Sequence, residues 1–533
     1  MQSRLMKSRL NQLVHSDYIW LLLSFVLSLF SFGPLATPLA PWLQLIVGLR
    51  FLRLRPSWRG FLWTWLAGSA SMLIVGRGLI PIPSPFFEVF AILSNLLPLL
   101  IYVVDRLVTP RIPGFASTLV LPSAAVAYGY IDALYLNGYG TWGNLANTQI
   151  DSPALTQSVS FVGLWGLVFL MHWVATVVNW AWQQNFEMPK VRNGLALCAS
   201  VLALLVMAGS LRLSISEPTA QTVRVAAIVP SNLKMLQNLD MAIFGQLTSG
   251  KAYSEADRTA LHNFNQSATD SLFALSEREA NNGARFIFWP EGALLLLAED
   301  EAQLVERGSQ LAKIEGVYLG MAYAVFHQGQ KAENKVVVVD PAGKVALNYL
   351  KTNLVPFAED AIFVQGDGRL PVLDTPYGRI AVAICHDLDH FDFMQQAGEQ
   401  NVDIVFAPTG DWADIKRVHL GMFALRAIEQ GFTLVRPTRG GISAVVDPQG
   451  RILASLDRGD AHFDGRIANA EVPAETSVLV GEAPVKGVVT IYRIVKDTLA
   501  WLSIVLLLGL CGWAAVGKLS GWKVGYPRVQ EVN

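Results

Sequence analysis

Three separate segments of the sequence contain residues that together could attack a carbonyl group. Glu291 follows the apolar residues Phe-Trp-Pro, Lys351 lies in the apolar setting Tyr-Leu-Lys-Thr-Asn-Leu-Val, and Cys385 ends the run Arg-Ile-Ala-Val-Ala-Ile. A thiol attacks as the thiolate, so it needs a base to take its proton. The oxyanion that forms needs a cation or a hydrogen-bond donor. The three side chains could therefore supply base, cation and nucleophile.

Each of these residues also has a plain structural interpretation. Glu291 could cap a helix that begins after Pro290, and Lys351 could be a surface lysine. Cys385 could be a core residue, because free cysteine is among the most buried residue types. The three lie far apart in the chain, so their spacing alone does not bring them together.

The elements that would position these residues belong to a predicted α/β domain. Strand and helix signals alternate over residues 214–495, which is typical of one layered α/β domain. Strands are expected at 223–230, 285–289, 317–322, 335–340, 345–349, 379–384, 403–407, 433–437 and 444–446, and helices at 257–280, 302–313 and 419–430. Strand ends are where an open α/β sheet exposes reactive groups, and Cys385 lies at such an end.

The composition of the whole chain is that of a membrane protein. Of the 533 residues, 52% are hydrophobic and 16% are charged, whereas soluble domains carry about 25% charged residues. Apolar runs long enough to cross a bilayer lie near 18–32, 37–53, 60–80, 87–108, 115–135, 157–182, 193–213 and 499–516. We therefore expect a membrane domain of seven helices at 1–213, a catalytic domain at 214–495, and a last helix with a tail at 496–533.

The basic residues predict an orientation. Connections rich in Lys and Arg alternate with connections that have none, as the positive-inside rule requires of cytoplasmic and outer loops. Both termini are then cytoplasmic, and residues 214–495 lie outside the cytoplasm. The first apolar run, preceded by Arg4, Lys7 and Arg9, could be a signal peptide, but no cleavage site follows it. One miscounted span would place the catalytic domain on the other side.

Charge and cysteine content narrow the chemistry further. The formal net charge is -1, which gives no indication of nucleic-acid binding. Of the three cysteines, Cys198 and Cys511 lie in apolar runs, so Cys385 is a lone thiol in the predicted catalytic domain. The chemistry above needs no metal or diffusible cofactor, and we expect none.

The order of the three motifs resembles a known superfamily. Trp-Pro-Glu, then Lys-x-x-Leu-Val-Pro-Phe-x-Glu, then Ile-Cys is similar to the Glu-Lys-Cys pattern of the nitrilase, or carbon–nitrogen hydrolase, superfamily. With eight spans around such a domain, the chain resembles the bacterial apolipoprotein N-acyltransferase family. The resemblance extends to membrane segments at 142–149 and 163–166 and to late segments at 419, 426–429 and 440–450.

The resemblance implies a fold and a role for each site residue. The fold would be a helical membrane bundle plus an αββα sandwich. Cys385 would be the acylated nucleophile, Glu291 the general base and Lys351 the oxyanion cation. Glu359 matches the supporting second carboxylate of the family. Asp387 stands where the family usually has Glu, one methylene shorter.

The departures from the family pattern lie around the expected substrate cleft. His386 and Asp387 replace an aromatic residue and a glutamate, and the stretch from Glu359 to the following strand is short. The segment that contains Trp412 differs from the usual Asn-Asp-Ala-Trp pattern. Trp142, in the polar connection 136–156, is either an interfacial anchor or part of a lipid entrance. Trp142, Trp412 and His386 are therefore candidate substrate contacts.

The first hypothesis is an N-acyltransferase of the bacterial inner membrane. It would move an acyl chain from a membrane phospholipid, through a Cys385 thioester, to the N-terminal amine of a diacylglyceryl-cysteine lipoprotein. Two alternatives use the same attack by Cys385 on a carbonyl. One is a membrane-anchored amidase-like hydrolase that uses water, and the other is an acyltransferase with another amine acceptor. A transporter or scaffold with a dead nitrilase domain is the non-enzymatic alternative, against which the intact Glu-Lys-Cys set argues.

Overall fold

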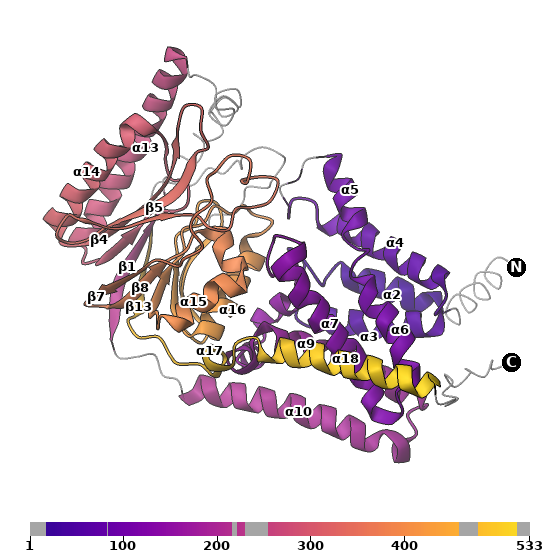
Figure 1. Cartoon of the computed structure of the whole chain (residues 1–533). Helices are drawn as coiled ribbons and strands as arrows, with labels where there is room; N and C mark the ends of the chain where they lie inside the picture. The colour runs from indigo at the N-terminus through magenta and orange to yellow at the C-terminus, as the bar shows by residue number, and fades with distance from the viewer. Residues whose placement is uncertain are drawn as a thin grey trace, which may run out of the picture. The chain divides into compact units, whose positions relative to one another are not determined.

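In the computed structural model, strand β8 (Gly378–Val382) runs toward Cys385 inside a six-stranded sheet (Figure 1). The structure describes residues 17–80, 82, 84–215, 221–229, 254–457 and 478–519. The basic residues Arg4, Lys7 and Arg9, and the basic tail residues Lys523 and Arg528 that also enter the predicted orientation, lie outside these ranges. The chain divides into a helical unit (1–132, 143–213 and 495–533) and an α/β unit (133–142 and 214–494).

The α/β unit contains two sheets. The first has the order β13-β1-β2-β4-β5-β6, with β3 paired to β4, and the second has the order β12-β11-β10-β9-β8-β7. In each sheet the central strands run parallel and the outer strands antiparallel. The first sheet comprises β1 (Thr222–Ile228), β2 (Phe286–Phe288), β3 (Leu295–Leu297), β4 (Tyr318–Phe326), β5 (Glu333–Val339), β6 (Val345–Leu350) and β13 (Val478–Pro484). The second comprises β7 (Val372–Thr375), β8, β9 (Ile404–Phe406), β10 (Thr433–Arg436), β11 (Ile442–Val446) and β12 (Ile452–Asp457).

The two sheets pack face to face through aromatic side chains. Side chains alternate between the faces of a strand, so Phe286 and Phe288 of β2 share one face and Ile287 takes the other. The Phe288 ring stacks on Phe406 of β9 at 3.9 Å between centroids, and Phe286 lies 5.1 Å from the same ring. Ile287 instead joins the core beneath the helices, with Leu272.

A pair of helices covers the outer face of each sheet. Helices α13 (Glu255–Asn281) and α14 (Ala298–Glu315) pack on the first sheet, and α15 (Phe391–Glu399) and α16 (Lys416–Gln430) lie with the second. The order of layers is helix, sheet, sheet, helix, as Figure 1 shows. The predicted αββα sandwich is therefore confirmed.

Several elements of the α/β unit were not expected from the sequence. Strands β3, β7, β12 and β13 and helix α15 lie outside the predicted ranges. Strand β3 has three residues, too few for an alternation pattern. Strand β13 pairs along its whole length with β1, from Thr222 opposite Pro484 to Ile228 opposite Val478. Such pairing between distant segments leaves no local signal.

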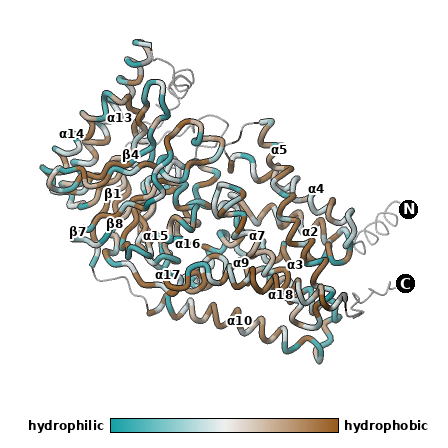
Figure 2. Tube along the Cα trace, viewed as in Figure 1, coloured by the Kyte–Doolittle hydropathy of each residue, from teal (hydrophilic) through white to brown (hydrophobic). Residues whose placement is uncertain are grey.

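The helical unit is built from apolar helices. They are α2 (Tyr18–Ser28), α3 (Ala40–Leu54), α4 (Trp58–Val75), α5 (Phe86–Leu93), α6 (Leu99–Val108), α7 (Val120–Ile131), α8 (Pro153–Thr156), α9 (Val159–Gln183), α10 (Met188–Ile215) and α18 (Thr498–Leu519). By length and composition, four segments of the described chain can cross a membrane: 114–136, 159–183, 188–215 and 498–517. Hydrophobic residues run along α9, α10 and α18, whereas α13 and α14 are mixed (Figure 2). The count of eight spans stays a prediction.

A buried ion pair ties two of the shorter helices together. Arg53 of α3 donates to Asp105 of α6 at 2.9 Å, and both side chains are 4% exposed. Thr109 donates a further hydrogen bond to Asp105 at 2.7 Å. A buried charge is costly unless it is paired, so this contact fixes how α3 and α6 meet.

Candidate active site

Cys385 lies at a strained elbow just beyond β8. It begins a short 3-10 turn, Cys385–Asp389, and its φ of 47° lies in the left-handed region that residues with a side chain rarely adopt. Its backbone N–H donates to the carbonyl of Pro408 at 2.9 Å. Strain of this kind persists only where the surroundings impose it, and it is common at active sites. The elbow presents the largely buried thiol to the neighbouring loops.

Glu291 lies in the turn that follows β2, among polar partners. Its Oε1 accepts hydrogen bonds from Asn334 Nδ2 and Lys351 Nζ, both at 2.8 Å. The thiol of Cys385 also lies close enough to this carboxylate to interact with it. The side chain of Glu291 is 10% exposed, so the carboxylate has little water around it.

Lys351 is the first residue after β6 and its side chain is 1% exposed. Its ammonium group lies 2.8 Å from Glu291 Oε1 and 2.8 Å from Glu359 Oε2. Glu359 also accepts from the backbone N–H of Val355 at 2.9 Å, which holds its carboxylate in place. One buried cation is thus shared by two carboxylates.

The protonation states follow from burial and these contacts. Burial opposes a charge on Lys351, but Glu291 and Glu359 outweigh it and raise the pKa of Lys351 well above its usual value. Burial would raise the pKa of Glu291, but Lys351 and Asn334 lower it below its usual value. Burial, and then the Glu291 carboxylate, raise the pKa of the Cys385 thiol. The resting site is a neutral thiol beside an ionised carboxylate and an ammonium group.

Asp387 links the cysteine elbow to the lysine segment. Its carboxylate accepts from the backbone N–H of Ile384 at 2.8 Å and from the hydroxyl of Tyr349 at 2.8 Å. The backbone N–H and side-chain amide of Asn353 donate to it at 2.7 and 3.1 Å. Burial raises the pKa of Asp387, although these donors oppose the rise. Asp387 therefore holds the residues on either side of the site rather than pointing at the thiol.

A buried chain of basic and acidic side chains runs beside the thiol. Arg436 donates to Asp411, whose other oxygen lies 2.7 Å from His419 Nδ1. His419 Nε2 is 3.2 Å from Asp389 Oδ1, and Asp389 Oδ2 is 2.6 Å from His386 Nδ1. Burial opposes the imidazolium, but Asp411 and Asp389 raise the pKa of His419 to about 9. We name this set the Asp–His chain.

The Asp–His chain does not offer a metal site. Cys385, Asp411 and His419 place ligand atoms within 4.8 Å of one another. However, both ring nitrogens of His419 carry protons that face carboxylates, so neither has a lone pair to give. Asp411 is neutralised by Arg436. The donor set does not fit a cation.

The three candidate substrate contacts occupy different places in the α/β unit. His386 lies against the segment 137–142, with Nε2 3.3 Å from the carbonyl of Gly138. The Trp142 ring meets the His419 ring edge to face, 5.4 Å between centroids. Trp412 is half-buried, directly after Asp411. None of these contacts establishes a substrate, and the three assignments stay predictions.

The structure brings in two side chains that the sequence analysis did not assign. Asn334, in β5, supplies a neutral donor to Glu291. Arg439, in the loop between β10 and β11, donates from Nη1 to the carbonyl of Gly292 at 3.0 Å. Both residues lie far from the three motifs in the sequence, so the motifs do not indicate that they belong to the site. For Arg439 the neighbouring Gly440-Gly441 pair is the one sequence feature that could have drawn attention to it.

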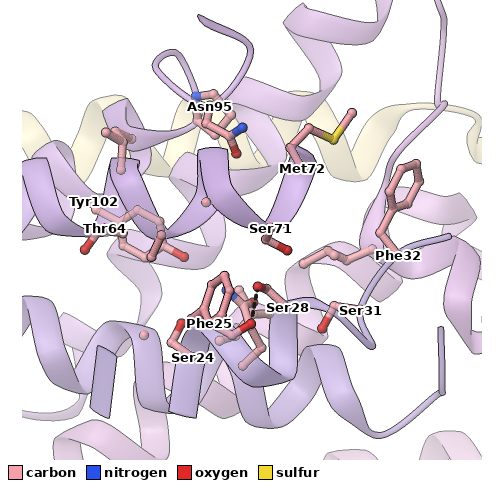
Figure 3. A pocket seen from close by; sticks show the side chains of 18 of the residues that line it. Ser24, Phe25, Ser28, Ser31, Phe32, Thr64, Ser71, Met72, Asn95 and Tyr102 are labelled. Carbon is pink, nitrogen blue, oxygen red and sulfur yellow. Dashed lines mark hydrogen bonds between the residues drawn. The ribbon is translucent and has the colours of Figure 1, made fainter. Parts of the chain in front are cut away.

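The helical unit contains a cavity of its own, with a volume of about 350 Å³. Figure 3 shows hydroxyl groups of α2 and α4 around it, with Asn95 and Tyr102 nearby. The hydroxyl groups that line it from this region belong to Ser24 and Ser28 of α2, Ser31 just beyond α2, and Thr64 and Ser71 of α4. Among the described residues that line this cavity there is no Lys, Arg, Asp or Glu. It is a polar but uncharged space between apolar helices.

Two family models match the chain. Residues 258–476 match carbon–nitrogen hydrolases, and residues 24–177 match the N-terminal domain of apolipoprotein N-acyltransferases. Fold and sequence thus define a helical protein with a carbon–nitrogen hydrolase domain. The chain belongs to the apolipoprotein N-acyltransferase family.

Individual proteins show the extent of the similarity. The chain is 25% identical over 363 residues to the apolipoprotein N-acyltransferase of Rickettsia bellii, covering 61% of this chain and 65% of that protein. It is 27% identical over 406 residues to the protein of that name from Bradyrhizobium diazoefficiens, covering 68% and 70%. The chain thus matches about two thirds of the length of these relatives. Among solved structures, an amidase from Nesterenkonia sp. matches at 19% identity and a TM-score of 0.36, covering 52% of this chain and 95% of the amidase.

Proposed function

We propose that the protein is a membrane N-acyltransferase that works through a thioester on Cys385. The acyl donor is a membrane phospholipid, and the acceptor is the N-terminal amine of a diacylglyceryl-cysteine lipoprotein. The observation that carries this proposal is the buried contact of the Cys385 thiol with Glu291, which shares the Lys351 ammonium with Glu359. The names of the relatives support acyl transfer to a lipoprotein.

In the first half-reaction, Glu291 takes the thiol proton as the sulfur attacks the ester carbonyl of the phospholipid. The negative charge that develops on the carbonyl oxygen is held by the Lys351 ammonium, which stays protonated because two carboxylates surround it. The carbon–oxygen bond to glycerol then breaks. Glu291 returns its proton to the departing oxygen, so a lysophospholipid leaves and the thioester remains.

In the second half-reaction, the amine of the lipoprotein attacks the thioester carbonyl. Glu291, ionised again, accepts a proton from the attacking amine. The carbon–sulfur bond breaks, the amide is released, and the sulfur regains a proton from Glu291. Atoms and protons balance without a metal or a diffusible cofactor.

The proposal includes a location. We place the protein in the bacterial inner membrane as a multi-pass protein, with the catalytic domain on the periplasmic side and both termini in the cytoplasm. The apolar helices α7, α9, α10 and α18 support membrane insertion, and the alternation of basic connections supports the orientation. A reporter fused after Asn533 should be active on the cytoplasmic side. Activity on the other side would contradict the orientation.

The intact mass of the purified protein tests the chemistry. After incubation with phospholipid, the mass should rise by one acyl chain, and a diacylglyceryl lipopeptide with a free amine should remove it. Cys385→Ala should take no adduct. Cys511→Ala is the matched control, since it removes a cysteine of α18 and leaves Cys385 in place.

The same experiment distinguishes the proposed acyl transfer from hydrolysis and from transfer to another acceptor. If water discharges the adduct as fast as the lipopeptide does, the protein is a hydrolase. If another amine discharges it and the lipopeptide does not, the acceptor is wrong. No adduct with any phospholipid would contradict the proposed donor.

A further inference from the structure

A second cation lies at the candidate active site and takes no part in the mechanism above. Arg439 belongs to the loop between β10 and β11, and its guanidinium is close enough to Glu291 and Cys385 for its charge to interact with both. Burial lowers the pKa of Arg439, although Glu291 and Cys385 oppose the change. Arginine nevertheless stays charged in proteins.

Glycines allow Arg439 to come this close. A methyl group added to Gly410 would lie 3.2 Å from Glu291 Oε2 and 3.5 Å from Arg439 Nη2, so both groups border the same glycine. Gly440, with a φ of 111°, lets the Arg439 loop pass the carbonyl of Asp411, which an added methyl would approach to 2.7 Å. The backbone N–H of Arg439 is fixed to the carbonyl of Thr409 at 3.0 Å. The loop is therefore held in place.

Most of the donors of Arg439 are unused. Within the part of the chain that the structure describes, its side chain makes one hydrogen bond, from Nη1 to Gly292, and no ion pair. The residue is half-buried, and none of its side-chain nitrogens is among the described polar atoms that are both fully buried and unpartnered. A desolvated guanidinium with free donors favours an anion with paired oxygens, above all a phosphate.

The charges of the site favour the same ligand. Lys351 is shared by the carboxylates of Glu291 and Glu359, so this group has one excess negative charge. Such a group repels an anionic substrate. The positive charge of Arg439 cancels this excess negative charge. Lys351 binds Oε1 of Glu291, whereas Oε2 faces Gly410, so Arg439 acts on the side of Glu291 that Lys351 does not contact.

We propose that Arg439 binds the phosphodiester of the acyl donor and so selects a phospholipid over an uncharged ester. This rests on the proposed function, which makes a phospholipid the donor. In a phospholipid the phosphate lies only a few bonds beyond the ester that Cys385 attacks. One molecule can therefore reach both the sulfur and the guanidinium. Arg439 is then a specificity residue and not the oxyanion cation.

Two donors with the same acyl chains test the proposal. Adduct formation on Cys385 is followed by intact mass, with phosphatidylglycerol and with diacylglycerol, which lacks the phosphate. Arg439→Gln should slow the reaction with phosphatidylglycerol about 10- to 100-fold, as expected for loss of a charge-assisted hydrogen bond. The reaction with diacylglycerol, which offers no phosphate to the guanidinium, should slow at least about 10-fold less than the reaction with phosphatidylglycerol. Arg307→Gln, an exposed cation on α14, is the control.

Other outcomes overturn the proposal. An equal loss with both donors would mean that Arg439 acts through the Gly292 turn or on the oxyanion. No loss with phosphatidylglycerol would mean that it binds no phosphate. Arg439→Lys keeps the charge and loses the two-pronged geometry, so its rate with phosphatidylglycerol should fall between those of the wild type and Arg439→Gln.

A binding measurement separates this proposal from the proposed function. In Cys385→Ala, which cannot be acylated, native mass spectrometry measures how much phosphatidylglycerol and diacylglycerol stay bound. Adding Arg439→Gln should weaken phosphatidylglycerol binding about 10-fold or more and spare diacylglycerol. Unchanged binding would overturn the role of Arg439 even if the wild type is acylated. Weakened binding would support that role even if the wild type forms no thioester.

Discussion

Lys351 Nζ lies 2.8 Å from Glu291 Oε1, and both groups are buried. The contact explains how a carboxylate can remain ionised next to a neutral thiol in a site with little water. Burial favours the protonated acid, and the ammonium reverses that preference. The same ammonium is held charged by the two carboxylates around it. The Glu291 carboxylate and the Lys351 ammonium therefore keep one another charged.

Replacing the carboxylate of Glu291 by an amide should separate catalysis from folding. Glu291→Gln keeps the shape and one acceptor oxygen for Asn334 and Lys351, but it cannot take the proton of Cys385. We expect adduct formation to slow about 10²–10⁴-fold. Intact mass after timed incubation measures the rate, and the melting temperature should stay close to that of the wild type. An unchanged rate would show that Glu291 is not the base.

Removing the buried ammonium should destabilise the fold as well as stop the chemistry. Lys351→Met leaves Glu291 and Glu359 together without a counter-charge, and breaking a buried pair costs about 3–5 kcal/mol. Chemical denaturation measures the free energy of unfolding. Adding Glu359→Gln should recover part of the loss. Lys331→Met, which removes an exposed lysine, should have little effect.

The Asp–His chain should make stability depend on pH. The folded pKa of His419, about 9, is above the ordinary value of 6.5. The contribution of protonated His419 to the free energy of unfolding is therefore complete below about pH 6.5. It is lost as the pH rises through about 9. For this fully buried group, the difference between the folded and the ordinary pKa corresponds to about 3 kcal/mol of folding stability.

Denaturation between pH 6 and 10 measures this dependence, in Cys385→Ala so that the thiol does not titrate. His419→Gln should flatten the curve over this range. His262→Gln, an exposed histidine of α13, should leave the slope unchanged. A slope that persists in His419→Gln would have another source.

Replacing Asp387 should lower both stability and the rate of adduct formation, because its carboxylate accepts several hydrogen bonds at once. Asp387→Asn turns an amide group toward the donors of Ile384, Tyr349 or Asn353. A buried donor without a partner costs about 1–3 kcal/mol. We expect a lower free energy of unfolding and slower adduct formation, because the elbow of Cys385 loosens. Asp374→Asn, an exposed aspartate of β7, is the control and should change neither quantity.

The architecture of the α/β unit could be predicted largely from local patterns. The strand before Cys385 and the helix at 419–430 have the expected periodicity, and both form close to the predicted bounds. The pairing of β13 with β1 could not be predicted, because register between distant segments depends on tertiary packing.

The candidate site was predictable in part. Glu291, Lys351 and Cys385 were brought together by the resemblance of their motifs, not by their spacing, and the structure places them in contact. The residues around the thiol were named only in part, and their contacts were not foreseen. The Asp–His chain joins four separate segments of the α/β unit, and Arg439 reaches the site from a loop position directly before the 440–450 segment. Such contacts depend on which loops meet, and a single sequence does not encode that locally.

The sandwich divides the reactive groups between its two halves. Glu291 and Lys351 follow strands of the first sheet, whereas Cys385 follows a strand of the second, and the stack of Phe288 on Phe406 joins the sheets. Neither sheet alone holds a complete set. A chain that is still emerging, or one whose sheets have not docked, therefore carries only an unactivated cysteine. Under the proposed mechanism, the cysteine becomes reactive only in the assembled domain.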